Sequence, residues 1–291
     1  MANIVTSKPH ITELIWDINK LLTSGKYGES GLASLSARFE GMFRSRLAET
    51  RELVEKSSVR MSNFGTTCER KLWYSVNEPE QAQPLLGHTR MKFLYGDILE
   101  QLVLSLAEEA GHEVTGQQDE VEFEGVVGHR DAVIDGVVID VKSANGRSFQ
   151  KYRKTPEEIR DDIWFQPYYT QLQLYLAGGQ NDPLVSNKNT AAFLAIDQEM
   201  GHLHLSLVPK QKKNWAEEVQ KKRKMLGEKD PPPRRFQDEV DGMSGNRKLC
   251  TYCSYCQYNK QCWPGLRTFI SSQGPKHLTV VKRVPSMIEK T

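Results

Sequence analysis

The sequence contains no long hydrophobic run and no strong excess of charge of either sign. No apolar stretch approaches the roughly 18 to 20 residues that cross a bilayer. Residues 1–10 lack the apolar segment of a secretory signal, so we expect a cytoplasmic protein without a membrane span. The formal net charge is only +2 over 291 residues. A surface that binds nucleic acid would therefore have to be local.

The chain also lacks the P-loop pattern G-x-x-x-x-G-K-[ST], so any helicase activity would belong to a separate partner chain. Its hydrophobic content of 38% and charged content of 26% are ordinary for a globular protein. The length allows one large α/β domain with accessory helices, or two modest domains.

Hydrophobic periodicity predicts an α/β or α+β core around a small mixed sheet flanked by helices. The expected helices cover 11–22, 32–53, 90–110, 166–176 and 212–225, with a short helix inside 62–74 and a helix start at 155–158. The expected strands cover 126–134, 137–141, 191–196 and 202–208. We expect a helical N-terminal extension over 1–60, a core over 61–230 and a cysteine-rich segment over 231–291.

Five cysteines are present, four of them within thirteen positions. In an intracellular chain this clustering favours metal ligation over disulfides. Two ligand sets fit the spacing. One is a local zinc site formed by Cys250, Cys253, Cys256 and Cys262. In the other, Cys68 replaces Cys250 and the four cysteines bind a [4Fe–4S] cluster.

The densest group of chemically active residues lies in a predicted hairpin. Asp135-Gly136 is a strong two-residue turn signal, and Asp131 and Asp140 lie four residues to either side of it. They should therefore face each other across the two arms. Lys142 is two residues beyond Asp140 on the same strand face, whereas Val141 points into the core.

Two facing carboxylates repel each other, and a divalent cation with a preference for hard oxygen ligands relieves that repulsion. Such an ion can activate water against a phosphodiester, with a lysine beside it to orient the water or neutralise charge. The alternative is a surface hairpin with solvated charges, in which Asp135 only serves the turn.

The order of motifs resembles that of the PD-(D/E)XK nuclease superfamily, specifically its RecB-like branch of phage exonucleases and CRISPR-associated adaptation nucleases. Asp131, Asp140 and Lys142 match its catalytic pattern. Gly96 and Glu100 match the preceding helix, and Gln171-Leu172-x-x-Tyr175 matches the following one. The resemblance covers Ser62 to Cys262 and implies a restriction-endonuclease-like core.

The resemblance also implies roles for individual residues. Glu100, Asp131, Asp140 and the Val141 carbonyl would hold Mg²⁺ or Mn²⁺, and Lys142 would position the water. Gln171 and Tyr175 would line the site and position DNA. The segment Cys68-x-Arg70-Lys71-x-x-Tyr74 matches the family's upstream cysteine motif, so Cys68 would join Cys253, Cys256 and Cys262 around the iron–sulfur cluster. Cys250 has no counterpart in that pattern.

We therefore expect a DNA nuclease, in the form of an exonuclease, acting in a bacterial or phage-infected cell in DNA repair, recombination or adaptation. Its partners would be single- or double-stranded DNA and a separate helicase, recombination or adaptation protein. Arg147, Lys151, Arg153 and Lys154 follow Lys142, and the interleaved Phe149 and Tyr152 could stack on bases. The alternatives are a non-catalytic nucleic-acid-binding protein of the same fold and a zinc-stabilised assembly protein.

Overall fold

The computed structural model describes residues 9–48, 58–85, 87–272 and 274–290, and the chain divides into two compact units. Unit 1 comprises Met1–Glu52, Val59–Thr67 and Gly87–Gln220, and unit 2 comprises Leu53–Ser58, Cys68–Leu86 and Lys221–Thr291. The N-terminal helices thus belong with the central sheet, and Cys68 belongs with the cysteine-rich C-terminal residues.

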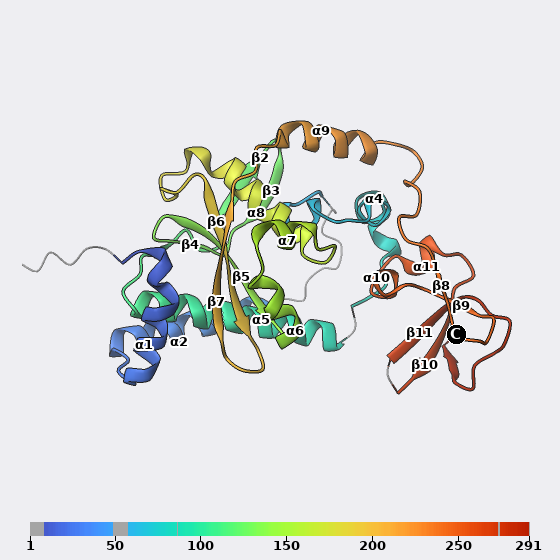
Figure 1. Cartoon of the computed structure of the whole chain (residues 1–291), viewed down its shortest axis with the longest axis horizontal. Helices are drawn as coiled ribbons and strands as arrows, with labels where there is room; N and C mark the ends of the chain where they lie inside the picture. Colours follow the sequence, from blue (N-terminus) through green and yellow to red (C-terminus); the bar gives the residue numbers. More distant parts are fainter. Residues whose placement is uncertain (1–8, 49–57, 86, 273, 291) are drawn as a thin grey trace, which may run out of the picture. The chain divides into compact units, whose positions relative to one another are not determined.

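Unit 1 is built on a sheet of five strands in the order β1-β4-β5-β6-β7. Figure 1 labels β4, β5, β6 and β7. The strands are β1 (Val114–Thr115), β4 (Ala132–Ile134), β5 (Val137–Ala144), β6 (Thr190–Asp197) and β7 (Leu203–Pro209). β5 and β6 run parallel, and the other neighbouring strands run antiparallel. The sheet is therefore mixed, as the sequence predicts.

Helices cover both faces of this sheet, which confirms the expected α/β class. One face packs against η1, α1 and α5, and the other against α3, α6, α7 and α8. The helices of unit 1 are η1 (Ile11–Glu13), α1 (Leu14–Ser24), α2 (Glu29–Phe43), η2 (Arg44–Ala48), α3 (Met61–Phe64), α5 (Gly87–Glu109), α6 (Gly146–Tyr152), α7 (Pro156–Asp161), α8 (Gln166–Gly178) and η4 (Gly179–Asn181). None of the described helices is both long enough and apolar enough to cross a membrane.

Most helix ends agree with the sequence pattern. Thr155 caps α7 as predicted, because its hydroxyl accepts from the Glu158 N–H and the Glu158 carboxylate accepts from the Thr155 N–H. α9 (Trp215–Leu226) begins three residues later than expected. The helix expected over 32–53 is realised as α2 followed by the π-helical turn η2, and its residues 49–53 lie outside the described part.

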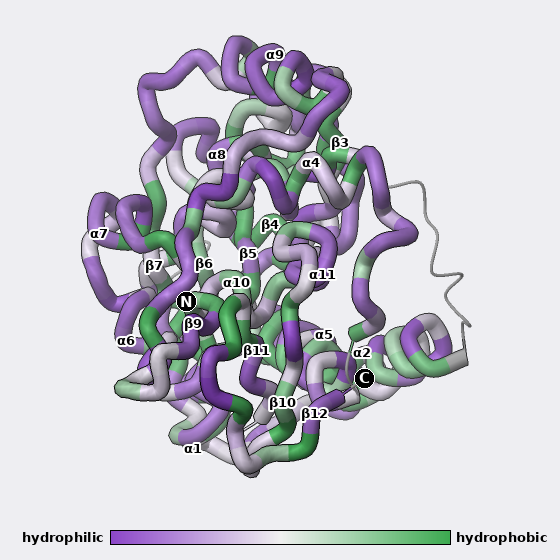
Figure 2. The backbone as a smooth tube through the Cα atoms, turned by 90° about the vertical axis from the view of Figure 1, so that its right-hand side faces the viewer, coloured by the Kyte–Doolittle hydropathy of each residue, from purple (hydrophilic) through white to green (hydrophobic). Residues whose placement is uncertain are grey.

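The alternation of side chains along β5 places the chemically active residues. Val137, Ile139 and Val141 join the core on the α1 and α5 side, and Val138 and Ala144 join the core on the α8 side. Asp140 and Lys142 therefore share the α8 side, because side chains two residues apart lie on one face. Hydrophobic colouring along β4 and β5 marks these buried strands in Figure 2.

The strand expected over 126–134 is wrong as a single element. β3 (Val126–His129) pairs with β2 (Glu120–Phe123) in a separate two-stranded sheet, and β4 begins only at Ala132. The break falls at Arg130, which is 2% exposed and ion-paired to Asp119 and Asp182. At this buried residue the chain leaves the pairing of β3 with β2 and enters the pairing of β4 with β5.

Unit 2 contains an antiparallel sheet that the sequence analysis did not predict, in the order β12-β10-β11-β9-β8. Its strands are β8 (Glu239–Val240), β9 (Arg247–Lys248), β10 (Arg267–Ser271), β11 (Gly274–Val280) and β12 (Ile288–Lys290). The helices of the unit are α4 (Glu69–Asn77), η3 (Pro79–Gln81), α10 (Thr251–Ser254) and α11 (Asn259–Cys262).

Candidate active site

The β4–β5 hairpin brings Asp131 and Asp140 together. Its turn is Asp135-Gly136, with φ of 49° and 77°, the left-handed values that a tight two-residue hairpin requires. The last ladder pair is Ala132 with Ile139. One residue beyond it, Oδ2 of Asp131 accepts a hydrogen bond of 2.6 Å from the Val141 N–H. The Asp131 side chain thus takes the place of a backbone acceptor where β4 has not yet begun.

Lys142 pairs with Asp140 on the same strand. Its Nζ lies 2.6 Å from Oδ2 of Asp140. The Asp140 side chain is 1% exposed and the Lys142 side chain 21% exposed. Burial disfavours the charged lysine, but the carboxylates of Asp140 and Asp131 outweigh it, and the pKa of Lys142 is raised. Lys142 is therefore a firmly protonated ammonium that still reaches solvent.

Glu100 reaches the same cluster from α5. Its Oε1 accepts a hydrogen bond of 2.8 Å from the Gln118 side chain. Burial is the main cause that raises the pKa of Glu100 to about 7, and the charges of Asp97 and Asp140 add to it. Burial likewise raises the pKa of Asp131, together with the charges of Asp140 and Glu100. Burial also raises the pKa of Asp140, against the effect of Lys142. Asp140 thus contacts the Lys142 ammonium, and the charges of the three carboxyl groups disfavour one another's ionised forms.

Gln171 and Tyr175 lie on α8, both buried. The Gln171 amide donates to the Tyr175 hydroxyl at 2.8 Å, and that hydroxyl donates to the His129 carbonyl at 2.5 Å. The pKa of Tyr175 is raised by burial and by the Asp140 charge. The charges of Asp140, Asp131 and Lys142 act on Tyr175, and Gln171 contacts Tyr175. The hydrogen bonds of Gln171 and Tyr175 end at the His129 carbonyl, two residues before Asp131.

Two tyrosines lie near Lys142, and the sequence analysis did not single out one of them, Tyr168. The Tyr168 ring, on α8 and 38% exposed, lies with its centroid 5.0 Å from the Lys142 ammonium. Tyr152 is buried, and burial raises its pKa against the effect of Lys142. The expectation that Phe149 and Tyr152 stack on bases is wrong, because both rings belong to the hydrophobic core. No local pattern distinguishes Tyr168 from its neighbour Tyr169, which is a core residue.

Gln118 was missed as well. It holds Glu100 from a loop in which its own φ is +56°, a value that non-glycine residues rarely adopt. Arg130 anchors this loop, since its Nε donates to the Gly116 carbonyl at 3.1 Å and its Nη2 to Asp119 at 3.0 Å. Only the glycine at 116 signalled a turn here.

A cleft of about 300 Å³ borders the cluster. Glu100, Asp97 and Gln118 line one side, and Arg38 and Arg46, from α2 and η2, line the other. The N-terminal helices thus reach the edge of the candidate site.

The acidic side chains of the cluster are engaged with protein partners. Within the described ranges, no group of three or more His, Cys, Asp or Glu side chains is placed so that it could hold a metal ion. One oxygen of Asp140 pairs with Lys142, and one oxygen of Asp131 accepts from Val141.

The five cysteines are free thiols that gather in unit 2. Burial raises the pKa of Cys253, and Cys250, which is within hydrogen-bonding reach, raises it further together with Cys256 and Cys262. Burial also raises the pKa of Cys256, with contributions from Cys68 and Cys262. The fold therefore brings Cys68 to the C-terminal cysteines and leaves Cys250 beside Cys253.

The segment after Cys68 is held to the C-terminal part of unit 2 by the residues of its motif. Arg70 donates to the Pro232 carbonyl at 2.7 Å and to the Tyr74 hydroxyl at 2.9 Å. The Tyr74 ring stacks on Tyr258 with centroids 5.8 Å apart. Arg70 and Tyr74 thus attach the helix that follows Cys68 to the C-terminal residues of the unit.

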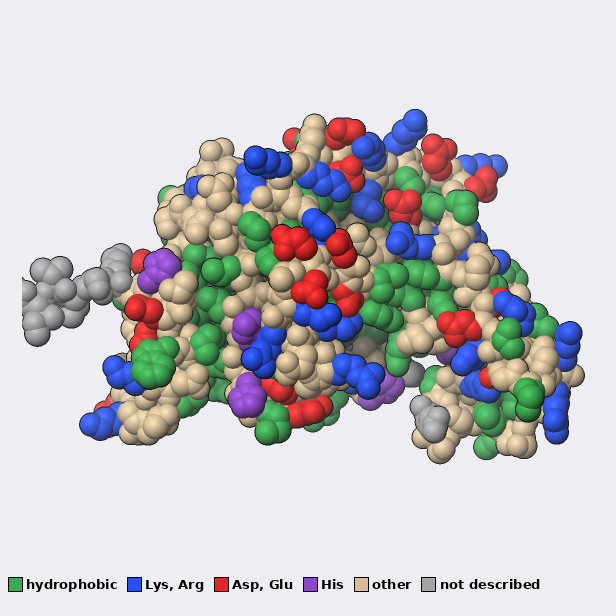
Figure 3. Space-filling model, viewed as in Figure 1, with side chains coloured by type: hydrophobic (Ala, Val, Ile, Leu, Met, Phe, Trp, Pro, Cys, Tyr) green, Lys and Arg blue, Asp and Glu red, His purple; other side chains and the backbone are tan. Residues whose placement is uncertain are grey.

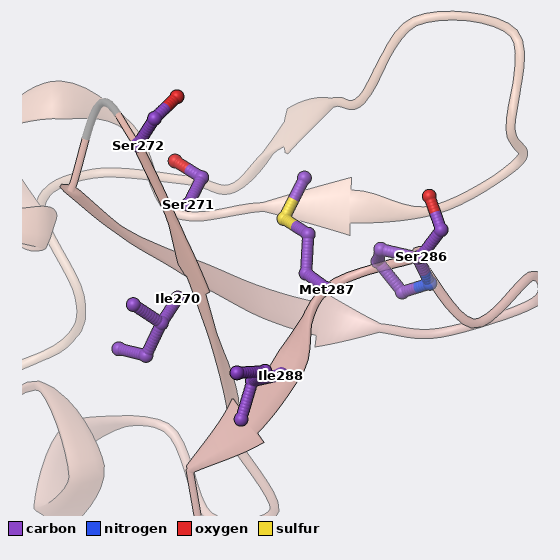
Figure 4. Close-up of a pocket in the computed structure, with 7 residues that line it drawn as sticks. Ile270, Ser271, Ser272, Ser286, Met287 and Ile288 are labelled. Carbon is purple, nitrogen blue, oxygen red and sulfur yellow. The ribbon is translucent and has the colours of Figure 1, made fainter.

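Two other features are not candidate sites. Acidic side chains gather over α7 in Figure 3, but Glu158 caps its own helix and Asp161 pairs with Arg160. In unit 2, a hollow of about 660 Å³ is lined by the end of β10 and by residues 285–288 (Figure 4). Its described lining consists of apolar residues, three serines and a proline, none of them ionisable.

Comparisons with known proteins add little. No family model matches the chain, and no curated protein matches it. Among solved structures, the one titled "Crystal structure of SSO0001" shares 16% sequence identity and has a TM-score of 0.43. The match covers 77% of this chain and 95% of that chain. A likeness at this TM-score carries no argument about function.

Proposed function

We propose that this chain is a metal-dependent deoxyribonuclease of the PD-(D/E)XK superfamily with a RecB-like core. The observation that carries the proposal is the placement of Asp131 and Asp140 with Lys142 on the β4–β5 hairpin, where Lys142 contacts Asp140 and the charges of Asp140 and Lys142 act on Glu100. Buried, mutually repelling carboxyls with raised pKa values cost stability, and such arrangements concentrate at functional sites. The matching order of motifs in the sequence supports the same conclusion.

The donor chemistry of the cluster suits Mg²⁺ or Mn²⁺. Carboxylates are hard oxygen ligands, and a divalent cation would favour the ionised forms of these acids, which burial disfavours in its absence. The Val141 N–H points toward Asp131, and the N–H and C=O of one strand residue face the same side. The Val141 carbonyl is therefore a fourth oxygen available to the set. Ion binding would draw Asp140 and Asp131 from their present partners.

The reaction is hydrolysis of a phosphodiester. The oxygen of a water molecule bonds to phosphorus, one ester P–O bond breaks, the water gives up a proton, and the leaving oxygen takes one up from solvent. Lys142, charged and partly exposed, holds the water or offsets charge on the phosphoryl oxygens. When bound, the divalent ion supplies Lewis-acid stabilisation of that charge.

Gln171 and Tyr175 act as positioning residues in this proposal. Their chain of hydrogen bonds ends at the His129 carbonyl, two residues before Asp131. Arg130, the residue between His129 and Asp131, is held by its ion pairs with Asp119 and Asp182. The backbone on the N-terminal side of Asp131 is therefore fixed at both His129 and Arg130.

The cysteines of unit 2 would hold a structural [4Fe–4S] cluster through Cys68, Cys253, Cys256 and Cys262, with zinc as the alternative metal. Thiolates suit either metal, and the neighbouring thiols raise one another's pKa when nothing neutralises them. Metal binding here would contribute to folding, because Cys68 lies far from the others in sequence.

A cleavage time course tests the proposed function. Full-length protein is incubated with end-labelled linear DNA and with circular DNA, single- and double-stranded, in Mg²⁺ or Mn²⁺. Loss of the end label first would indicate an exonuclease, and linearised circles would indicate an endonuclease. Asp140→Ala and Lys142→Ala proteins, purified identically, must be inactive. DNA binding without cleavage by the wild-type protein would instead favour a non-catalytic module.

A further inference from the structure

The cleft beside Glu100 has one wall from the N-terminal helices. α2 packs along α5 (Figure 1), and η2, which follows α2, lies beside the middle of α5, where Arg46 pairs with Asp97. Arg46 comes from η2, a π-helical turn, which is a local geometry often found at functional sites. Glu100 lies on the opposite wall. A group in the cleft is therefore close to the candidate cluster.

The two arginines of this wall differ in availability. Arg38 is 17% exposed and is held by Glu108 at 2.5 Å and by Gln117 at 2.7 Å. Arg46 is 39% exposed, and its guanidinium forms a fork on Asp97, with Nε 3.0 Å from Oδ2 and Nη2 3.2 Å from Oδ1. Arg38 is thus held inside the wall by two partners, while the guanidinium of Arg46 is partly exposed at the cleft, where a phosphate could compete with Asp97 for it.

The lining favours a phosphate over a base. A guanidinium fork that accommodates a carboxylate also accommodates two phosphate oxygens. Among the described residues that line the cleft, none carries an aromatic ring on which a base could stack.

We propose that this cleft binds a backbone phosphate of DNA that neighbours the scissile phosphate. Arg46 would exchange its pairing with Asp97 for this phosphate. The inference rests on the proposed function and assigns the N-terminal helices to the substrate-binding site. Arg46 would bind the strand equally before and during the reaction, so its loss should act on KM and leave kcat unchanged.

Binding of labelled single-stranded and duplex oligonucleotides, measured by fluorescence anisotropy in Ca²⁺ at several salt concentrations, tests the inference. Arg46→Ala should weaken binding about tenfold and reduce the slope of log affinity against log salt by about 0.7 to 0.9. Arg44→Ala is the matched control, because Arg44 lies on the same turn, is 76% exposed and pairs with Glu40. It should bind like the wild type.

Asp97→Asn separates phosphate binding from a structural tether. If Arg46 binds phosphate, removing the competing carboxylate keeps or increases the affinity for DNA. If Arg46 only ties η2 to α5, Asp97→Asn should lose as much affinity as Arg46→Ala, and the inference is overturned. Unchanged affinity and salt slope in Arg46→Ala would also overturn it, and thermal melting checks that each variant is folded.

Failure of the nuclease proposal has a different outcome. If the wild type binds DNA but never cuts it, the nuclease proposal fails. The affinities of the wild type and of Arg46→Ala still show whether the cleft binds phosphate. If the wild type cuts DNA and Arg46→Ala cuts with an unchanged KM, only the cleft inference fails. Absence of any DNA binding by the wild type overturns the inference.

Discussion

The carboxylate of Asp131 accepts a 2.6 Å hydrogen bond from the backbone N–H of Val141. One candidate metal ligand is therefore part of the hydrogen bonding of the sheet, because it continues the pairing of β4 with β5 beyond Ala132. Its position is set by the hairpin and does not depend on a freely rotating side chain. Asp140 is placed as firmly by burial.

We expect Lys142→Ala to abolish DNA cleavage and to lower the free energy of unfolding by about 1–3 kcal/mol, because the buried Asp140 loses its ion-pair partner. Cleavage assays and urea unfolding measure the two effects. The double variant Asp140→Asn, Lys142→Ala should regain much of the stability and stay inactive, since the amide carries no charge. Full cleavage by folded Lys142→Ala protein would refute the proposed role of the lysine.

Cleavage should require Mg²⁺ or Mn²⁺ and should stop in chelator. Ca²⁺ should support DNA binding with little cleavage, because its coordination is looser. Mg²⁺ should also raise the melting temperature by relieving repulsion among the acids. Asp131→Asn should reduce that rise, while its amide oxygen can still accept from Val141. Robust cutting in excess chelator would show that the carboxylates do not serve a metal.

The stability of the metal-free protein should fall as pH rises from about 4.5 to about 7. The pKa of Glu100 is raised from 4.5 to about 7, so within this window the folded state binds its proton more tightly than the unfolded chain. The stabilisation is complete below this window and is lost through it, by up to about 3 kcal/mol. Asp131 and Asp140 act in the same direction, because their pKa values are also raised.

Denaturant unfolding in chelator at several pH values measures this effect. Glu100→Gln should flatten the pH dependence, because the amide does not ionise. Glu157→Gln, which changes an exposed acid on α7, is the control and should keep the wild-type slope. Equal slopes for wild type and Glu100→Gln would contradict the assignment.

Protein purified without oxygen should be brown and should contain about four iron and four sulfide ions per chain. Cys68→Ala should lose colour and stability, whereas Cys250→Ala should keep both. Iron and sulfide analysis with thermal melting measures these outcomes. Cys250 lies beside Cys253 and Cys68 lies near Cys256, so either thiol could complete the ligand set. Comparing the two variants therefore decides between the two ligand sets. Reversed outcomes, or zinc as the bound metal, would rule out the proposed ligand set.

Local sequence rules predicted much of the fold around the site. The turn at Asp135-Gly136, the alternation along β5 and the cap at Thr155 depend on neighbouring residues, so their patterns are visible in the sequence. The sheet of unit 2 was missed because several of its strands are only two or three residues long, and β12 is exposed at every residue.

The missed site residues depend on long-range partners. Arg130 breaks the expected strand because it pairs with Asp182, far along the chain. Gln118 reaches Glu100 from a loop whose unusual backbone no short pattern predicts, and Arg46 meets Asp97 across two helices. The motif residues of the core could be found because their spacing on one strand or one helix is local.

The topology of the sheet also has a consequence for the order of folding. The β4–β5 hairpin closes through a two-residue turn and can form within microseconds, whereas β5 must wait for β6, whose Ala191 pairs with Val138 from far along the chain. Asp131 and Asp140 thus become neighbours before the strands and helices that bury them arrive. The two carboxylates are thus brought together by local sequence, whereas the environment that buries them is assembled from distant strands and helices.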